Sequence, residues 1–183
     1  MGEGVGHGLI SISETRSEYW PMKSATKNTR IVNASPRAIY NAFTDPAALV
    51  AWQAPGNMTA QIHHFDLKIG GGYEMSLFYP EKEAGITEGK TSENEDRYRA
   101  KFIELVPFKK IVQAINFDSR DPGFAGEMIM EVTLEARGDA TLVTIVFENI
   151  PPGIDPRNNE AGTESSLDKL ALYVGDERGS HDF

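Results

Sequence analysis

The sequence contains no cysteine among its 183 residues, and this absence removes several classes of chemistry. Disulfide bonds, thiolate metal sites and a cysteine nucleophile are all excluded, because each of them needs a thiol. A chain without thiols gives no sign of an oxidising compartment, so we expect a cytoplasmic protein.

The chain is also poor in positive charge and in long apolar runs. It carries 18 Lys and Arg against 27 Asp and Glu, which gives a net charge of −9 and a pI of about 4.9. Nucleic acids and anionic membranes bind basic faces, so neither is expected as a partner. No apolar run approaches the ~20 residues of a membrane span, and the acidic, glycine-rich start lacks the features of a secretory signal.

The composition that remains is that of a globular protein. Hydrophobic residues make up 40% of the chain, enough for one domain with a sizeable core. Residues 1–27 show little periodicity and are expected to form a flexible N-terminal extension. Residues 28–178 are expected to form one domain, and residues 179–183 a C-terminal tail.

The longest helical pattern covers residues 156–177. Leu167, Leu170, Ala171 and Val174 fall at i, i+3, i+4 and i+7, which makes one apolar stripe on a helix. Such a helix must bury its stripe on another element, because it is not stable alone.

Most of the remaining chain has the spacing of short strands. They are expected at residues 29–34, 59–67, 73–79, 98–106, 110–117, 127–136 and 141–150. Ser35-Pro36 and Asp45-Pro46 each place a capping side chain before a proline, which predicts two short helices after the first strand. Tight turns join most of the later strands, so we predict an α+β fold with a curved antiparallel sheet around the long C-terminal helix.

Residues 80–96 interrupt the strands with a polar, charged stretch that contains Gly85 and Gly89. We predict a long hairpin loop here. Loops of this length in compact domains are often binding loops.

Several short segments along this order resemble a known family. They are ASPRAIYNAFTDP at residues 34–46, Trp52, DLKIGG at 66–71, FIELVP at 102–107, KIV at 110–112, NEAG at 159–162 and SLDKLA at 166–171. Together they resemble the helix-grip fold of the START-like superfamily over about residues 28–175. The closer match is to stand-alone members of the family named after the C-terminal domain of the activator of Hsp90 ATPase. That family often carries Trp after the glycine of the last helix, where this chain has Thr163.

The resemblance implies a cavity between the sheet and the long helix. The residues expected to line it are Trp52, Tyr73, Met75, Tyr79, Gln113, Phe117, Met128, Met130, Phe147, Leu167 and Leu170. Methionine and aromatic side chains with a few polar groups suit an adaptable apolar pocket. The same residues also suit a solid core, so both alternatives stay open.

Five residues have side chains that could carry chemistry. Neighbours on a strand point to opposite faces, so His63 and His64 are not expected to share a metal ion. Asp66 is expected to bind backbone N–H groups of the glycine turn that follows it. Glu104 and Glu148 interrupt apolar strands and are expected to face solvent, with an inward acid or base role left open.

No cofactor, no metal and no catalytic residue is identified, and no nucleophile elbow is present. The resemblance implies a domain that binds a small apolar or amphipathic molecule. Two alternatives remain: an enzyme of the polyketide cyclase type that uses the same cavity with Glu, His or Tyr as the acid or base, and a chaperone-interacting module. The sequence leaves a homodimer open and does not identify the ligand.

Overall fold

The computed structural model describes residues 24–81 and 89–179, and of residues 176–179 only the backbone. Most of the expected N-terminal extension and C-terminal tail therefore lie outside the described residues. The elements are β1 (Ser24–Val32), α1 (Pro36–Thr44), α2 (Pro46–Trp52), β2 (Thr59–Asp66), β3 (Gly72–Phe78), β4 (Glu95–Val106), β5 (Lys110–Phe117), the 3₁₀ helix η1 (Pro122–Phe124), β6 (Met128–Arg137), β7 (Ala140–Ile150) and α3 (Pro156–Gly179).

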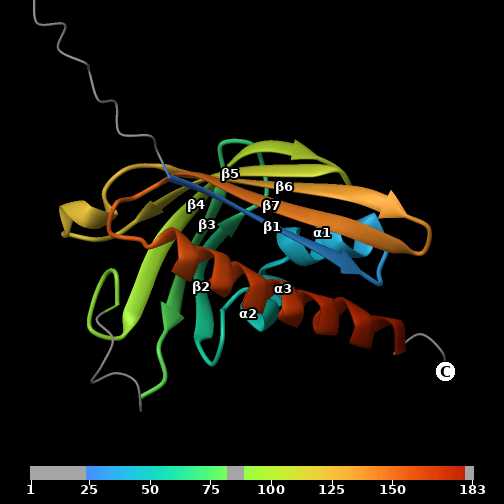
Figure 1. Ribbon diagram of the computed structural model, residues 1–183, viewed down its shortest axis with the longest axis horizontal. Coiled ribbons are helices and arrows are strands. Elements are labelled where there is room, and N and C mark those ends of the chain that lie inside the picture. Colours follow the sequence, from blue (N-terminus) through green and yellow to red (C-terminus); the bar gives the residue numbers. More distant parts are fainter. Residues whose placement is uncertain (1–23, 82–88, 180–183) are drawn as a thin grey trace, which may run out of the picture.

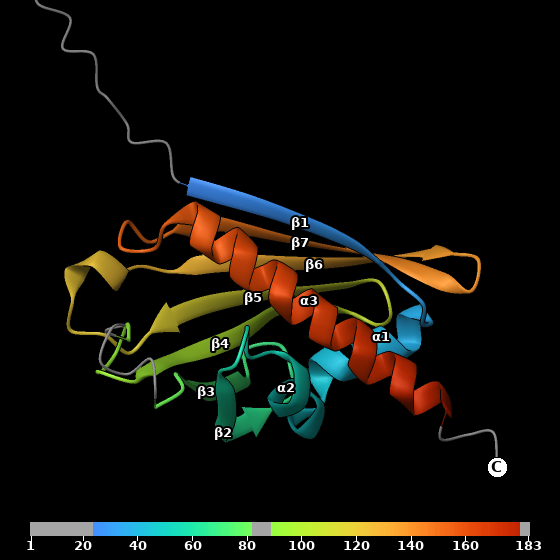
Figure 2. The ribbon, with the colours of Figure 1, turned by 60° about the horizontal axis from the view of Figure 1, so that its bottom comes forward.

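The predicted α+β fold is confirmed. The seven strands of the described chain form one sheet in the order β1-β7-β6-β5-β4-β3-β2, and every neighbouring pair is antiparallel. The sheet is curved, and α3 crosses its inner face with α1 and α2 beside it (Figures 1 and 2). The three α-helices therefore cover one face of the sheet, and no other α-helix of the described residues lies on the opposite face (Figures 1 and 2).

The two short helices begin where the capping signals predict. The side chain of Ser35 accepts a hydrogen bond from Ala38 N at 3.2 Å, and Asp45 Oδ1 accepts one from Ala48 N at 2.8 Å. Each bond satisfies a backbone donor that has no partner within its own helix.

The first strand begins at Ser24, five residues before the start expected from side-chain alternation. Its first half is polar, and it is a strand because its backbone pairs with β7, from Ser24 opposite Ile150 to Val32 opposite Thr141. Backbone pairing of this kind leaves no hydrophobic pattern, so the sequence did not reveal it.

The turn before β3 depends on a close backbone approach at Gly72. Its φ is +150°, and a Cβ added there would lie 1.9 Å from the carbonyl oxygen of Ala100 on β4. Only glycine fits between the two strands at this point, which explains the last glycine of the Gly70-Gly71-Gly72 run.

The apolar stripe of α3 is buried on the sheet. Leu167, Leu170 and Val174 are at most 2% exposed, whereas Leu172 on the opposite side of the helix is 69% exposed. On the solvent side, Asp168 pairs with Arg30 of β1 and ties the helix to the edge of the sheet. The second half of α3 is therefore held by apolar packing, whereas the first half is held by hydrogen bonds, among them Asn159 Nδ2 to Thr26 Oγ1 of β1 at 2.8 Å.

Truncating Leu170 to Ala should lower the free energy of unfolding by about 2–5 kcal/mol, because it leaves a cavity in a packed core. Urea unfolding of the variant measures this. Leu172→Ala on the same helix is the matched control, and it should cost less than about 0.5 kcal/mol. Equal costs for the two variants would contradict the orientation of the helix.

Candidate ligand-binding site

A cavity of about 480 Å³ lies between the sheet and the first half of α3. Its sheet wall consists of Leu77, Tyr98, Ile115, Met128, Met130, Ile145 and Phe147, and its helix wall of Asn158, Asn159, Gly162, Thr163 and Ser166. Phe43, Trp52, Gln53, Pro55 and Met58 close one side. The size is that of sites that hold small organic molecules, which are typically about 300–1,000 Å³.

The cavity exists because the two halves of α3 carry side chains of different size. Its first turns present Gly162, Thr163 and Ser166 to the sheet, and all three line the cavity. The next turns present Leu167 and Leu170, which fill the corresponding space. Thr163 stands where the resembled family often carries Trp, so a small residue lies at a position that a large one often fills.

The expected cavity residues divide into two groups. Trp52, Tyr79, Phe117, Met128, Met130 and Phe147 line the cavity. Tyr73, Met75, Gln113, Leu167 and Leu170 are buried in the core beside it and do not belong to its lining. That these residues bind a ligand stays a prediction.

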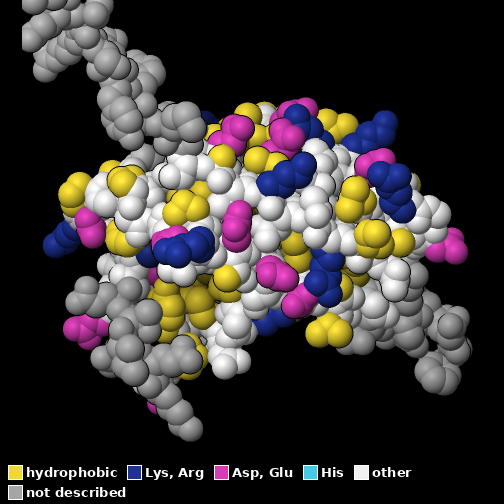
Figure 3. Space-filling model, viewed as in Figure 1, with side chains coloured by type: hydrophobic (Ala, Val, Ile, Leu, Met, Phe, Trp, Pro, Cys, Tyr) yellow, Lys and Arg dark blue, Asp and Glu magenta, His cyan; other side chains and the backbone are white. Residues whose placement is uncertain are grey.

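Figure 3 shows hydrophobic side chains gathered between the first turns of α3 and the strands β3 and β4. A buried acid lies at this end of the cavity. Asp96, only 3% exposed, accepts hydrogen bonds from Lys90 N at 2.6 Å and from the Tyr79 hydroxyl at 3.0 Å, and it also pairs with Lys90 Nζ. The same ammonium lies 5.6 Å from the centre of the Phe117 ring. The charge of Asp96 is thus compensated, and the cluster gives the apolar cavity a polar rim.

A second polar group lies deeper, beside the cavity wall. Gln53 Nε2 donates to the Tyr73 hydroxyl at 3.1 Å, and that hydroxyl donates to Gln113 Oε1 at 3.2 Å. The Tyr98 hydroxyl donates to Met75 Sδ at 3.1 Å, and a thioether is a weak acceptor. Within the described part of the chain, Gln113 Nε2 has no hydrogen-bond partner although Gln113 is completely buried.

Burial sets the protonation of these tyrosines. It raises the pKa of Tyr98 well above its usual value, and the neighbouring Tyr73 and Asp96 add to the effect. Burial also raises the pKa of Tyr73 and of Tyr79, and the negative charge of Asp96 reinforces the rise for Tyr79. All three phenols therefore stay protonated at neutral pH and act as hydrogen-bond donors.

The two histidines do not alternate as predicted, and that expectation was wrong. β2 carries a β-bulge at this point, since Ile62 pairs with Met75 and His64 pairs with Glu74, which leaves His63 as the extra residue. Both histidines are exposed. A bulge breaks the period of two, so adjacent residues need not point to opposite faces.

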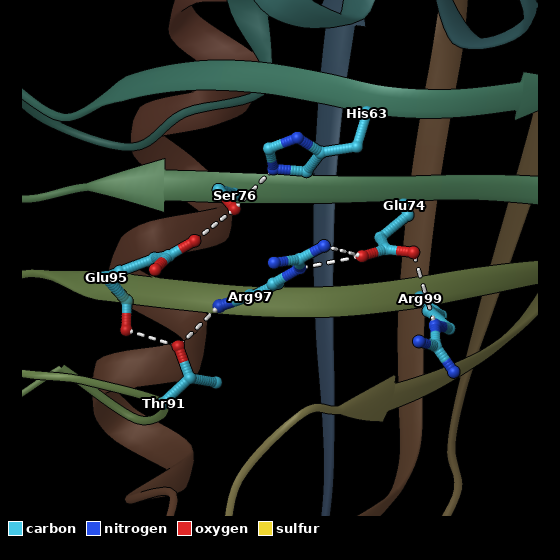
Figure 4. Close-up of polar contacts among 7 residues, drawn as sticks. All are labelled: His63, Glu74, Ser76, Thr91, Glu95, Arg97 and Arg99. Atoms are coloured by element: carbon cyan, nitrogen blue, oxygen red, sulfur yellow. Dashed lines mark hydrogen bonds and ion pairs between the residues drawn. The ribbon is translucent and has the colours of Figure 1, made fainter.

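His63 belongs to a polar network on the sheet face away from α3 (Figure 4). Its Nε2 lies 2.8 Å from Ser76 Oγ, which in turn donates to Glu95. In the same network Glu74 accepts from Arg97 Nε at 2.6 Å. The sheet separates this network from the cavity, so it does not supply a cavity residue.

The acidic candidates also lie away from the cavity lining. Asp66 pairs with Lys68 Nζ at 2.7 Å, and it is the Asp66 backbone carbonyl, not its carboxylate, that bonds Lys68 N in the turn. Glu104 pairs with Lys110 at 3.1 Å, and Glu148 is exposed. The expected bond from the Asp66 carboxylate to the turn backbone is therefore not formed.

Within the described ranges, no three His, Cys, Asp or Glu residues lie close enough together to hold a metal ion. None of the helices in these ranges combines the length and the apolar composition that crossing a membrane requires.

Sequence reasoning did not identify most of the polar residues that line the site, which are Gln53, Lys90, Asp96, Asp155, Asn158, Asn159, Thr163 and Ser166. Lys90 and Asp96 lie within the stretch predicted as a binding loop, but nothing in its composition singled them out. Tyr98 was placed in a strand, and its position two residues after Asp96 puts both on the inner face of β4. The alternation of side chains along β4 was the signal that could have placed Asp96 and Tyr98 on the same face. It requires a strand that begins at Glu95, whereas the sequence predicted one that begins at residue 98.

A curved antiparallel sheet that encloses a long C-terminal helix, with a cavity between them, defines the helix-grip architecture of START-like proteins. The chain belongs to the activator of Hsp90 ATPase homolog 1-like family, whose model matches residues 33–175.

Solved structures agree with this assignment. The chain is 31% identical to a protein from Chromobacterium violaceum, with 84% of this chain and 98% of that one covered and a TM-score of 0.73. It is 27% identical to a protein from Rhizobium loti, with 82% and 96% covered and a TM-score of 0.65. A Staphylococcus epidermidis protein, 16% identical with 85% and 92% covered and a TM-score of 0.67, shares the fold. No curated protein sequence matches the chain.

The buried tyrosines predict how stability depends on pH. A raised pKa means that the folded chain keeps a phenol proton that the unfolded chain loses above about pH 10, so stability should fall as the pH rises through this range. Absorbance at 295 nm measures tyrosine ionisation. At about pH 10.5, Tyr98→Phe should lower the signal of the urea-unfolded chain and leave that of the folded chain unchanged. An equal loss in both states would show that Tyr98 ionises in the folded chain.

Proposed function

We propose that this domain binds one small apolar or amphipathic molecule in the cavity between the sheet and α3. The observation that carries the proposal is the cavity itself, about 480 Å³ in size and walled by aromatic, methionine and aliphatic side chains. Apolar walls with a few placed polar groups are the usual composition of small-molecule sites.

Two further features support binding over a solid core. The small side chains of Gly162, Thr163 and Ser166 leave space between the first half of α3 and the sheet wall. Met128 and Met130, both on the sheet wall, are flexible and can adapt to ligands of different shape. The cavity is open to solvent, so a ligand that displaces water from its apolar walls would stabilise the folded chain.

A binding function also fits the family, whose fold is that of a ligand-binding type of domain. The enzyme alternative would need an acid or base that reaches the ligand. The histidines and glutamates that the sequence suggested for this role lie outside the cavity lining. Tyr79 and Tyr98 do line it, but burial raises the pKa of both, so neither is a base at neutral pH. No specific observation therefore favours catalysis over binding. The cytoplasmic location and the oligomeric state stay predictions.

The neutral dye N-phenyl-1-naphthylamine should bind at one site per chain, with a rise in fluorescence that saturates. Met130→Trp should abolish this rise, because the larger side chain occupies the cavity, and urea unfolding should show little loss of stability. Ile129→Trp, on the same strand but facing away from α3, is the matched control and should leave dye binding intact.

A core without a cavity predicts the opposite result for both measurements. In a filled core the added volume of Met130→Trp would cost about 1–3 kcal/mol of stability through overpacking. Absence of dye binding by the parent chain, together with a strongly destabilised Met130→Trp, would contradict the proposed function.

A further inference from the structure

The cavity wall and the core directly behind it carry hydrogen-bond donors that the protein itself satisfies poorly. Tyr98 lines the cavity on β4 and is 6% exposed. Its hydroxyl donates to Met75 Sδ, and a thioether is a much weaker acceptor than an oxygen. The nearby Tyr73 hydroxyl also interacts with it, but that oxygen already accepts a hydrogen bond from Gln53 Nε2. Burial raises the pKa of Tyr98, so this hydroxyl keeps its proton and remains a donor.

Gln113 shows the same shortage of acceptors independently. It lies directly opposite Met130, a lining residue of β6, and is completely buried. Its Oε1 accepts from Tyr73, whereas its Nε2 donates to no acceptor among the residues that the structure describes. A buried donor without an acceptor is costly, and native proteins leave few of them.

The charged residues at the rim of the cavity limit the charge that a ligand can carry. Lys90 is the only cation among the described lining residues, and it is already paired with the buried Asp96. A carboxylate placed near Tyr98 would therefore meet no available cation and would lie close to the negative charge of Asp96. An uncharged oxygen would accept a hydrogen bond there without that repulsion.

We infer that the ligand of this cavity carries an uncharged hydrogen-bond-accepting oxygen, a ketone or ester carbonyl on an apolar body, which Tyr98 binds at the β4–β5 wall. The oxygen replaces Met75 Sδ as the acceptor of the Tyr98 hydroxyl. This inference rests on the proposed function and specifies the chemical class of the ligand.

The test uses three probes of similar length on the full chain: 2-undecanone, 1-undecene, which lacks the oxygen, and undecanoate, which is charged. Each displaces N-phenyl-1-naphthylamine in a competition titration. The readout is the ratio of the Kd of the ketone to that of the alkene, compared between the parent chain and Tyr98→Phe. The hydration of each probe is the same in both experiments, so its contribution cancels when the two ratios are compared.

Tyr98→Phe should raise the ratio about 5- to 10-fold, the effect of one net hydrogen bond. Tyr40→Phe, which removes a hydroxyl on α1 that does not belong to the cavity lining, is the matched control and should leave the ratio unchanged. Undecanoate should not respond to Tyr98→Phe, because its charged end stays in water at the rim. In the parent chain, the infrared carbonyl band of bound 2-undecanone should lie below its position in hexane.

The outcomes separate the inference from the proposed function. If neither the dye nor 1-undecene binds the parent, both fail. If they bind, but Tyr98→Phe leaves the ratio unchanged and the carbonyl band stays at its hexane position, only this inference fails. An undecanoate affinity that falls as much as that of the ketone would contradict the uncharged oxygen. Should Tyr98→Phe not fold, the carbonyl band of the parent decides.

Discussion

The contact between the second half of α3 and the sheet is the constraint on which the rest of the structure depends. Leu167, Leu170 and Val174 remove almost all of their surface from water against the inner face of the sheet. The first half of the helix is held over the sheet by hydrogen bonds from Asn159 to Thr26 of β1 and from Ser166 to the backbone of Gln53, without filling the space beneath it. The cavity is the result of a firm anchor beside a run of small side chains.

The same packing explains why polar groups occur where they do. A buried polar group needs a partner, and the rim provides one for each member of the cluster that Asp96 forms with Lys90 and Tyr79. The inner wall and the core behind it are different, because the Tyr98 hydroxyl has a thioether and the already bonded Tyr73 hydroxyl as its neighbours, and Gln113 Nε2 bonds no described residue. An apolar space bordered by underused donors is better suited to a ligand with an acceptor than to a solid hydrocarbon core.

Much of the fold could be predicted from the sequence, because its local signals agree with the tertiary structure. The caps at Ser35 and Asp45 and the stripe on α3 are local patterns, and the helices follow them. The features that could not be predicted depend on pairing between distant segments. The start of β1 is set by β7, and the bulge at His63 is set by β3. The site was predicted in part for the same reason: side-chain type indicated Met128 and Met130, whereas Lys90 and Asp96 meet only in the folded chain.

The most direct test of a ligand cavity between the sheet and α3 is a crystal structure of the chain with 1-bromodecane, in which anomalous scattering locates the bromine. The account predicts one bromine site per chain, between Met130 of the sheet and Thr163 of α3, with the backbone of both elements in place. Side chains that fill this space, with bromine only at the molecular surface, would contradict it.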